Sequence, residues 1–282
     1  YVNTRWELGW SYEFNGKSVD MTKWGYQEGT GAEYGVEGWG NDEQQYYTRN
    51  NLEIQNGKLV IKADNDGMGG KPYTSSRLWT SGKFEKAYGR FEAKMKLPEG
   101  AGLWPAFWMI PADEEYGGWA SSGGLDIMEA RGREIDKVDG TIHYGRGWPN
   151  NQASGGSYTF ENGEDMTGYH VYAVEWEPGE IRWYVDGQLF HTENNWSSYG
   201  ADTAAKYAYP APFDKPFYLV LNLAVGGSYD GGVLPEDSIF PVYMEVDYVR
   251  TYDLVGREPI PAVEPIIQPE EVPSNANQPV NG

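Results

Sequence analysis

The chain has 282 residues, with 42 acidic and 22 basic side chains, a formal net charge of −20 and no cysteine. A chain this negative repels phosphate backbones and anionic lipid, so we expect no nucleic-acid partner and no membrane-surface partner. The lack of cysteine excludes disulfides, catalytic thiols and zinc–thiolate sites. The 37 glycines and the 15% aromatic content favour strands and tight turns over helices.

Short runs of apolar and polar residues, broken by Gly, Pro, Asn or Asp, predict many strands. They include residues 52–54, 59–62, 89–97, 181–185 and 218–225. The alternation in 91–97 predicts one buried face, whereas 218–225 is apolar on both faces and predicts an inner strand. Asp186-Gly187 predicts a hairpin turn. This spacing of strands and turns is typical of a β-sandwich or barrel.

The composition changes after Tyr252. Residues 253–282 contain six prolines and no aromatic side chain. We therefore divide the chain into one domain, residues 1–252, and a Pro-rich linker or tail, residues 253–282. The alternative interpretation is an arm that lies over the sandwich.

Two carboxylates, Asp126 and Glu129, lie within an apolar β-type run. On a regular strand Asp126 shares a face with Gly124, while Glu129, three positions later, points to the opposite face. A β-bulge that includes Met128 would bring Glu129 back to the face of Asp126. The apolar neighbours Leu125, Ile127 and Met128 argue against a solvated edge strand.

This strand resembles the active-site strand of glycoside hydrolase family 16 in its bulged, laminarinase-like form. Further family-like segments follow in the expected order between about Trp6 and Tyr252: residues 10–16, 38–43, 74–77, 88–92, 102–109, 140–145, 221–227 and 245–250. The resemblance implies an all-β fold, a β-jelly-roll sandwich of two curved antiparallel sheets with a concave substrate cleft. It also implies endo-hydrolysis of β-1,3-glucosidic bonds in laminarin-type glucans by a retaining double displacement.

The resemblance makes Glu129 the general acid/base and Asp126 its assisting carboxylate. The family's nucleophilic Glu is replaced here by Gly124, which has no atom that can attack an anomeric carbon. Because retaining hydrolysis needs two carboxyl groups about 5–5.5 Å apart, we expect hydrolysis to be impaired in this chain. A single loss of this kind is typical of an engineered substrate trap or glycosynthase. His143, expected on the neighbouring strand, would tune the acid or contact the acceptor sugar.

The remaining site residues also rest on the resemblance. Trp104, Trp108 and Trp119 would stack on sugar rings, and Asn41, Arg77 and Asn222 would bind sugar hydroxyls. No catalytic cofactor is implied. A structural calcium ion on the convex face would be held by Glu13, the carbonyl of Gly57 and Asp247. The alternative is that Glu13 and Asp247 are ordinary surface acids, which are common in a chain with 42 acidic residues.

The expected partner is a β-1,3-glucan oligo- or polysaccharide, and the expected form is a secreted, extracellular monomer. Three alternatives stay open. Mixed-linkage β-1,3-1,4-glucanases usually lack the insertion that Met128 represents. Agar and carrageenan hydrolases act on galactose polymers that are often sulfated, which suits a chain of charge −20 poorly. A non-catalytic glucan-binding protein usually loses several catalytic positions, whereas Asp126, Glu129 and His143 all remain.

Overall fold

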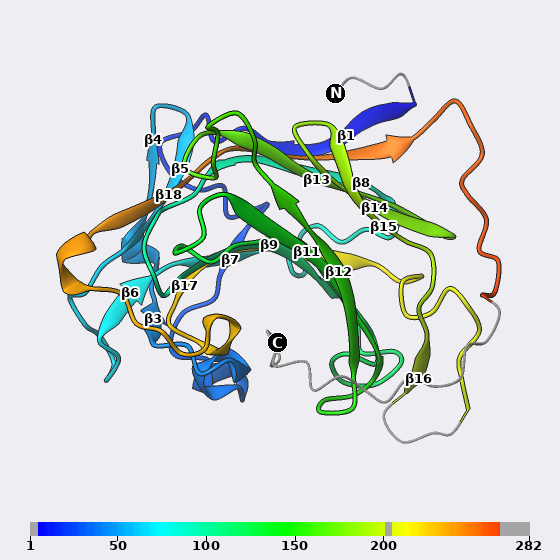
Figure 1. Ribbon diagram of the computed structural model, residues 1–282, viewed down its shortest axis with the longest axis horizontal. Coiled ribbons are helices and arrows are strands. Elements are labelled where there is room, and N and C mark those ends of the chain that lie inside the picture. The colour runs from blue at the N-terminus through cyan, green and yellow to red at the C-terminus, as the bar shows by residue number, and fades with distance from the viewer. Residues whose placement is uncertain (1–4, 201–204, 266–282) are drawn as a thin grey trace.

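The computed structural model describes residues 5–200 and 205–265 and contains two large β-sheets that lie face to face (Figure 1). The strands of the outer sheet are β1 (Trp6–Tyr12), β4 (Leu52–Gln55), β5 (Lys58–Ala63), β8 (Gly89–Lys96), β13 (His170–Glu177), β14 (Glu180–Val185), β15 (Gln188–Glu193) and β18 (Val242–Leu254). Their order is β15-β14-β13-β8-β18-β5-β4, and β1 pairs with β18. All these pairs are antiparallel.

The inner sheet carries the predicted catalytic strand. Its strands are β2 (Gly25–Tyr26), β7 (Arg77–Trp79), β9 (Leu103–Pro111), β10 (Gly124–Glu129), β11 (Lys137–Arg146), β12 (Gln152–Thr159), β16 (Ser198–Gly200) and β17 (Phe217–Val225). Their order is β12-β11-β10-β9-β17-β7-β2, with β16 parallel to β11. The predicted all-β jelly-roll sandwich is confirmed.

Within the described part of the chain, the smaller elements are one parallel strand pair and five short 3₁₀ segments. The strand pair is β3 (Gln45–Tyr47) with β6 (Tyr73–Ser75). The helices are η1 (Ala32–Tyr34), η2 (Glu37–Gly40), η3 (Arg49–Asn51), η4 (Ser228–Asp230) and η5 (Asp237–Ile239). Within the described residues, no helix has the length and apolar character needed to cross a membrane.

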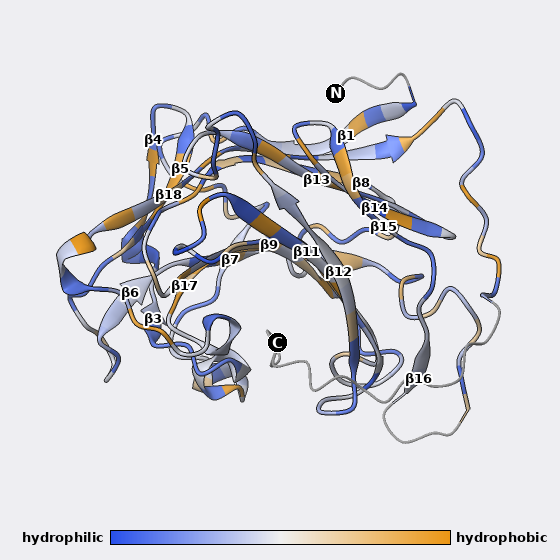
Figure 2. Cartoon of the chain, viewed as in Figure 1, coloured by the Kyte–Doolittle hydropathy of each residue, from blue (hydrophilic) through white to orange (hydrophobic). Residues whose placement is uncertain are grey.

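The main hydrophobic core lies between the two sheets. Figure 2 shows apolar residues along the strands of both sheets and hydrophilic residues in most connecting loops. Every residue of β9 is buried, but its two faces differ. Leu103, Phe107 and Met109 join the main core, whereas Trp104 and Trp108 belong to two small separate clusters. The second face of the inner sheet therefore has its own layer of buried side chains, which includes Trp104 and Trp108.

The predicted strands are present, with one correction. β17 is buried on both faces, and Asp186 (φ 50°) and Gly187 (φ 77°) form the hairpin turn. Only the C-terminal half of β8 has one partly exposed face, formed by Lys94 and Lys96. Arg90 and Glu92 are buried instead, because Arg90 forms ion pairs with Glu92 (3.2 Å) and Glu175 (2.7 Å).

The segment after Tyr252 first completes β18, which runs to Leu254. Residues 255–265 then follow the outer sheet without regular secondary structure. Arg257 donates to both carboxylate oxygens of Glu177 at 2.7 Å, and the backbone N–H of Ile260 also donates to Glu177 (2.9 Å). These contacts attach the 255–265 arm to Glu177 at the end of β13. Residues 266–282 lie outside the described part of the chain.

Candidate active site

The predicted β-bulge is present in β10. Asp126 pairs with Trp108 of β9, and Glu129 pairs with Ala106, so three steps along β10 match two steps along β9. The register shift lies between Asp126 and Met128. Because residues two apart on β9 share a face, Asp126 and Glu129 also share one. On the other side, Gly124 pairs with His143 of β11.

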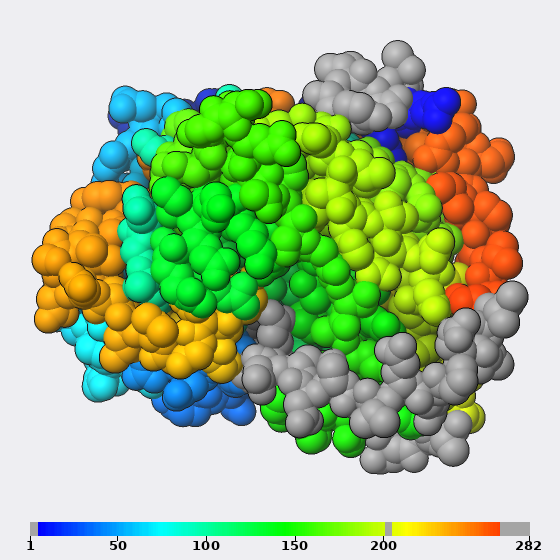
Figure 3. All heavy atoms as spheres, in the orientation of Figure 1, coloured from blue at the N-terminus to red at the C-terminus, as the bar shows by residue number. Residues whose placement is uncertain are grey.

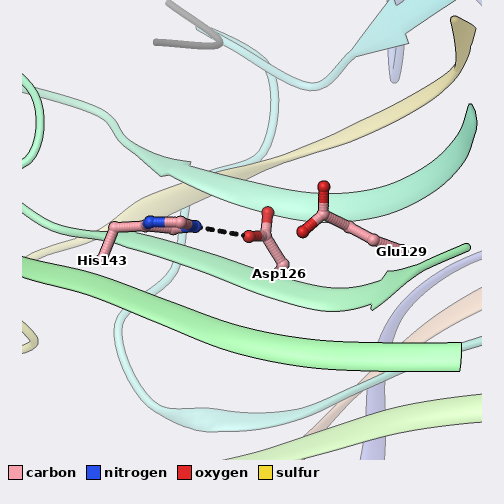
Figure 4. Close-up of side chains that lie close together, drawn as sticks. All are labelled: Asp126, Glu129 and His143. Atoms are coloured by element: carbon pink, nitrogen blue, oxygen red, sulfur yellow. Dashed lines mark hydrogen bonds and ion pairs between the residues drawn. The ribbon is translucent and has the colours of Figure 1, made fainter. Parts of the chain in front are cut away.

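The side chains of His143, Asp126 and Glu129 lie in a row on this face (Figure 4). Nε2 of His143 is 2.7 Å from Oδ2 of Asp126, and Glu129 lies on the far side of Asp126. One ligand-type atom from each residue lies within 4.8 Å of the others, and all three residues are at most 3% exposed. The structure therefore brings together three of the four predicted catalytic positions, with Gly124 adjacent.

Burial changes the proton affinities of this row. Burial raises the pKa of Asp126 to about 7, although a hydrogen bond with Glu129 acts to lower it. Burial, the charge of Asp126 and that hydrogen bond together hold the pKa of Glu129 well above its ordinary value. Burial also lowers the pKa of His143 to about 4. Asp126 therefore ionises before Glu129, and Glu129 keeps its proton longest, as a general acid must.

A side chain at position 124 would lie beside His143 of this row and in close contact with Trp119. A Cβ atom at this position would lie 3.0 Å from Nε1 of Trp119 and 3.6 Å from Cβ and Cδ2 of His143. The backbone of Gly124 does not adopt the left-handed conformation that favours glycine. The backbone therefore accepts a larger residue, and its Cβ atom requires the half-buried Trp119 ring to move by a few tenths of an ångström.

Trp104 and Trp119 both border the row. Nε1 of Trp104 donates to Oε2 of Glu129 at 3.0 Å. The Trp119 and His143 ring centroids are 5.0 Å apart, with the planes at 40°. The carbonyl oxygen of Trp119 accepts from the N–H of Trp148 (3.0 Å), which anchors the loop that carries Trp119.

The predicted sugar-binding residues form a polar layer over β9, β17 and β7. Nε1 of Trp108 donates to Oδ1 of Asn222 (2.7 Å), and Asn222 pairs with Arg77 across the ladder. The guanidinium carbon of Arg77 lies 4.4 Å from the Trp39 ring centroid and 5.0 Å from that of Trp108. Nη1 and Nη2 of Arg77 are buried and make no hydrogen bond within the described residues. Protein atoms enclose these donors, so the side chains around Arg77 would have to move before a ligand hydroxyl could accept from them.

Asn41 lies beside two residues that sequence reasoning missed. Nδ2 of Asn41 donates to Glu43 (2.8 Å), and the hydroxyl of Tyr47 donates to the other oxygen of Glu43 (3.0 Å). Tyr47 in turn accepts from Nδ2 of Asn222 (3.1 Å). Glu43 lies in the family-like segment 38–43, but only the fold reveals that it connects Asn41 to Asn222.

The predicted calcium residues lie on neighbouring segments of the outer sheet. Tyr12, which precedes Glu13, pairs with Val249, and Val246, which precedes Asp247, pairs with Leu59 of the hairpin that contains Gly57. The Glu13 carboxylate is held by Arg250 (3.1 and 3.2 Å from Nε), and Asp247 lies 3.8 Å from Lys94. The carboxylate of Glu13 therefore does not fit as a ligand, and the candidate donors are backbone carbonyls together with Asp247.

A second acidic group with a histidine lies on the outer sheet, formed by Glu164, His170 and Asp186. Nδ1 of His170 lies 2.6 Å from Asp186, and Nε2 lies 2.8 Å from the carbonyl oxygen of Asp165. Both ring nitrogens are engaged by protein acceptors. His170 therefore connects the 161–168 loop to the β14–β15 turn through these two hydrogen bonds.

The chain is similar to known proteins along most of its length. The family model of Glycosyl hydrolases family 16 matches residues 39–238. A glucan endo-1,3-β-glucosidase A1 of Niallia circulans is 48% identical over 87% of this chain, and a β-glucanase of Rhodothermus marinus is 43% identical over 88%. The matched region spans 37% of the first relative and 85% of the second.

Solved structures of similar sequence also share this fold. The laminarinase catalytic domain of Thermotoga maritima superposes with a TM-score of 0.77 at 36% identity, covering 89% of this chain and 99% of that one. The endo-β-1,3-glucanase of Pyrococcus furiosus superposes with a TM-score of 0.77 at 39% identity, covering 89% and 96%. The fold that carries the row of His143, Asp126 and Glu129 is therefore shared along almost the whole length of these two solved chains.

Proposed function

The chain belongs to Glycosyl hydrolases family 16, and on that premise we propose that its scaffold is a retaining endo-1,3-β-glucanase acting on laminarin-type glucans. The observation that carries this proposal is the buried pair Asp126 and Glu129 on one face of a bulged strand, with Gly124 two residues before Asp126. The names of the relatives from Niallia circulans and Rhodothermus marinus support the β-glucan substrate.

The proposed reaction needs a carboxylate at position 124. That carboxylate would attack the anomeric carbon while Glu129 protonates the departing glycosidic oxygen, so a glycosyl–enzyme ester forms as the glycosidic bond breaks. Glu129 would then deprotonate a water molecule, which displaces the ester and regenerates the carboxylate. Asp126 would hold Glu129 in its protonated form through the hydrogen bond between the two side chains.

We propose that hydrolysis is impaired in this chain because Gly124 cannot form the ester. The residues predicted to bind sugar over β9, β17 and β7 all remain, so oligosaccharides should still bind as in a substrate trap. An α-glycosyl fluoride could replace the ester, because an acceptor hydroxyl can displace fluoride while Glu129 takes the hydroxyl proton. One protein of similar fold is a Glu-to-Ser mutant of SCLam, a non-specific endo-β-1,3(4)-glucanase. It was co-crystallised with an oligosaccharide and has an oligosaccharide at its active site.

The test is to install Glu at position 124. Gly124→Glu should hydrolyse laminarin with retention of anomeric configuration, as followed by ¹H NMR of the first products. Gly124→Gln fills the same space without a carboxylate and should stay inactive. Lichenan, agarose and carrageenan, assayed in parallel, distinguish the mixed-linkage and galactan alternatives. An inverted product, or no activity on any β-glucan, would refute the assignment of position 124.

A non-catalytic glucan-binding protein is the second candidate, and Gly124 is the observation that favours it. A β-1,3-glucan-binding protein of Penaeus monodon is 36% identical over 58% of this chain. This candidate predicts that Gly124→Glu binds laminari-oligosaccharides but gains no hydrolysis.

Three further points are part of the proposal. We propose an extracellular protein, because a polysaccharide substrate does not enter cells intact, and a monomer, because the site is built from one chain. We also propose a structural calcium ion held by the carbonyls of Glu13 and Gly57 and by Asp247. Fractionation of the native source and sedimentation of the purified chain test the first two points.

A further inference from the structure

The carboxyl group of Glu129 is held by a chain of contacts that leads away from the substrate-binding layer. Its first member is Trp104, whose indole N–H donates to Oε2 of Glu129 at 3.0 Å. Trp104 is 3% exposed, so the direction of this hydrogen bond depends on what packs against the indole. Whatever displaces the indole also displaces the donor.

The indole packs against η4 and the glycine before it. The rings of Trp104 and Tyr229 are stacked, with centroids 4.9 Å apart and planes at 23°. Gly227 (φ 95°) covers another part of the ring, because a Cβ atom there would lie 3.2 Å from the indole carbons. Only glycine combines this conformation with so close an approach. The position of Trp104 is therefore set by the segment that follows β17.

Tyr229 is held in turn by Asp139 on β11 and by Arg131, which follows β10. Its hydroxyl donates to Oδ2 of Asp139, which pairs directly with Glu129 across the β10–β11 ladder. The guanidinium carbon of Arg131 lies 3.8 Å from the Tyr229 ring centroid, and Nη1 of Arg131 lies 3.0 Å from the same Asp139 oxygen. Nε of Arg131 donates to the carbonyl oxygen of Tyr229 (3.1 Å).

A neighbouring ion pair strengthens the attachment. Nε of Arg133 lies 2.7 and 2.9 Å from the two oxygens of Asp230. In the space-filling view the gold surface of the segment after β17 borders the green surface of the residues that follow β10 (Figure 3). The contacts thus run from β10 through Arg131, Asp139, Tyr229 and Trp104 back to Glu129 on β10.

We propose that Tyr229 is a positioning residue, which holds Trp104 so that its N–H binds and orients the carboxyl group of Glu129. This inference rests on the proposed role of Glu129 as acid/base. Tyr229 lies close enough to Glu129 for their charges to interact, and the proposed action on the orientation of the carboxyl group passes through the indole. A donor to the carboxylate favours the ionised form, so loss of the donor should make Glu129 harder to ionise.

The ionisable groups around Glu129 are Asp126 on its own strand, His143 and Asp139 on β11, Arg131 beyond the end of β10 and Tyr229 on η4. A test must therefore change the position of Trp104 while leaving these charges in place. Tyr229→Leu removes the stacking partner without changing any charge at neutral pH. Tyr229→Phe keeps the stacked ring and removes only the hydroxyl that donates to Asp139.

The experiment measures the coupling of α-laminaribiosyl fluoride to an acceptor against pH, and the carboxyl titration of Glu129 by ¹³C NMR, in the full chain. Trp104→Phe should raise the midpoint pH of coupling and the titration midpoint of Glu129 by about one pH unit. At a pH below the midpoint, such a shift lowers the ionised fraction of Glu129 about tenfold. Tyr229→Leu should shift both midpoints in the same direction, and Tyr229→Phe by less. Tyr243→Leu, an exposed position on β18, is the matched control and should shift neither.

The proposal is overturned if folded Tyr229→Leu titrates and couples with the same midpoints as the parent chain. It is also overturned if Trp104→Phe shifts the midpoints and Tyr229→Leu changes only thermal stability. If the parent chain fails to couple at all, the proposed role of Glu129 as a base in this chain is refuted, and the NMR titration still decides the positioning role.

Discussion

Nε2 of His143 lies 2.7 Å from Oδ2 of Asp126, and both side chains are buried on the inner sheet. Burial lowers the pKa of His143 to about 4, so the imidazole is neutral at pH 7. A neutral imidazole contributes one donor and one acceptor, so this contact orients Asp126 without supplying a charge. The charge that keeps the proton on Glu129 therefore comes from Asp126.

Glu129 should titrate lower in this chain than in Gly124→Glu. The added carboxylate would lie about 5 Å from Glu129 and raise its pKa further by like-charge repulsion. Coupling from α-laminaribiosyl fluoride needs Glu129 as a base, so its rate should rise with pH as Glu129 ionises. Rate profiles and ¹³C NMR titration of both proteins check this.

Glu129→Gln is the control for that experiment and should abolish coupling. Coupling that survives in Glu129→Gln, or a lower pKa of Glu129 in Gly124→Glu than in the parent, would mean that the roles along β10 are wrongly assigned.

Trp108→Ala and Trp119→Ala should each weaken laminari-oligosaccharide binding by about 1–3 kcal/mol, the scale for stacking of ring ligands on aromatic side chains. The two should differ in stability. Trp108 is 2% exposed and bonded to Asn222, so its truncation should also cost about 3–5 kcal/mol of unfolding free energy. Trp119 is half-buried, and its truncation should cost less.

Calorimetry and urea unfolding separate these effects. If either variant loses stability but keeps its full affinity, that tryptophan is a core residue and not a sugar platform.

Glu177→Gln should detach the 255–265 arm and destabilise the sandwich. Burial alone would raise the pKa of Glu177, but hydrogen bonds from Arg257, the Ile260 N–H and Arg182 lower it to about 2. Because the folded-state pKa lies below the ordinary value, this stabilisation is present above about pH 4.5 and is lost as the pH falls towards 2.

Urea unfolding at pH 7 should therefore show a loss of about 3–5 kcal/mol in Glu177→Gln, the cost of breaking a buried ion pair. The difference from the parent chain should narrow near pH 2. Glu258→Gln, next to the arm's Arg257, is the control and should change little. An equal difference at both pH values would exclude the ion pairs as its cause.

Calcium removal should lower the melting temperature and leave oligosaccharide affinity nearly unchanged, because the proposed ligands lie on the outer sheet. Asp247→Ala should abolish the sensitivity to chelator. Glu13→Gln should retain it, since Arg250 already occupies that carboxylate. Differential scanning calorimetry with and without chelator measures the shift. An unchanged melting temperature in the parent chain would remove the metal from the proposal.

The sequence by itself determined the strand-rich architecture and the placement of Asp126 and Glu129 on one face of β10. Alternation and turn residues reflect local geometry, so β17 and the Asp186-Gly187 hairpin could be predicted from nearest neighbours. The bulge at Met128 followed from parity, because only one extra residue places Asp126 and Glu129 on one face. Gly124 was identified by its position in a motif, with no need of the fold.

Tertiary structure alone decided which residues far apart in the sequence contact one another. Arg250 takes the Glu13 carboxylate because β1 and β18 are adjacent, although 237 positions separate the two residues. Arg90 and Glu92 are buried because Glu175 approaches them from β13, which alternation within β8 cannot reveal. Tyr229 reaches Trp104 because β17 and β9 pair along their whole length. Such contacts depend on strand order, and local sequence patterns do not encode strand order.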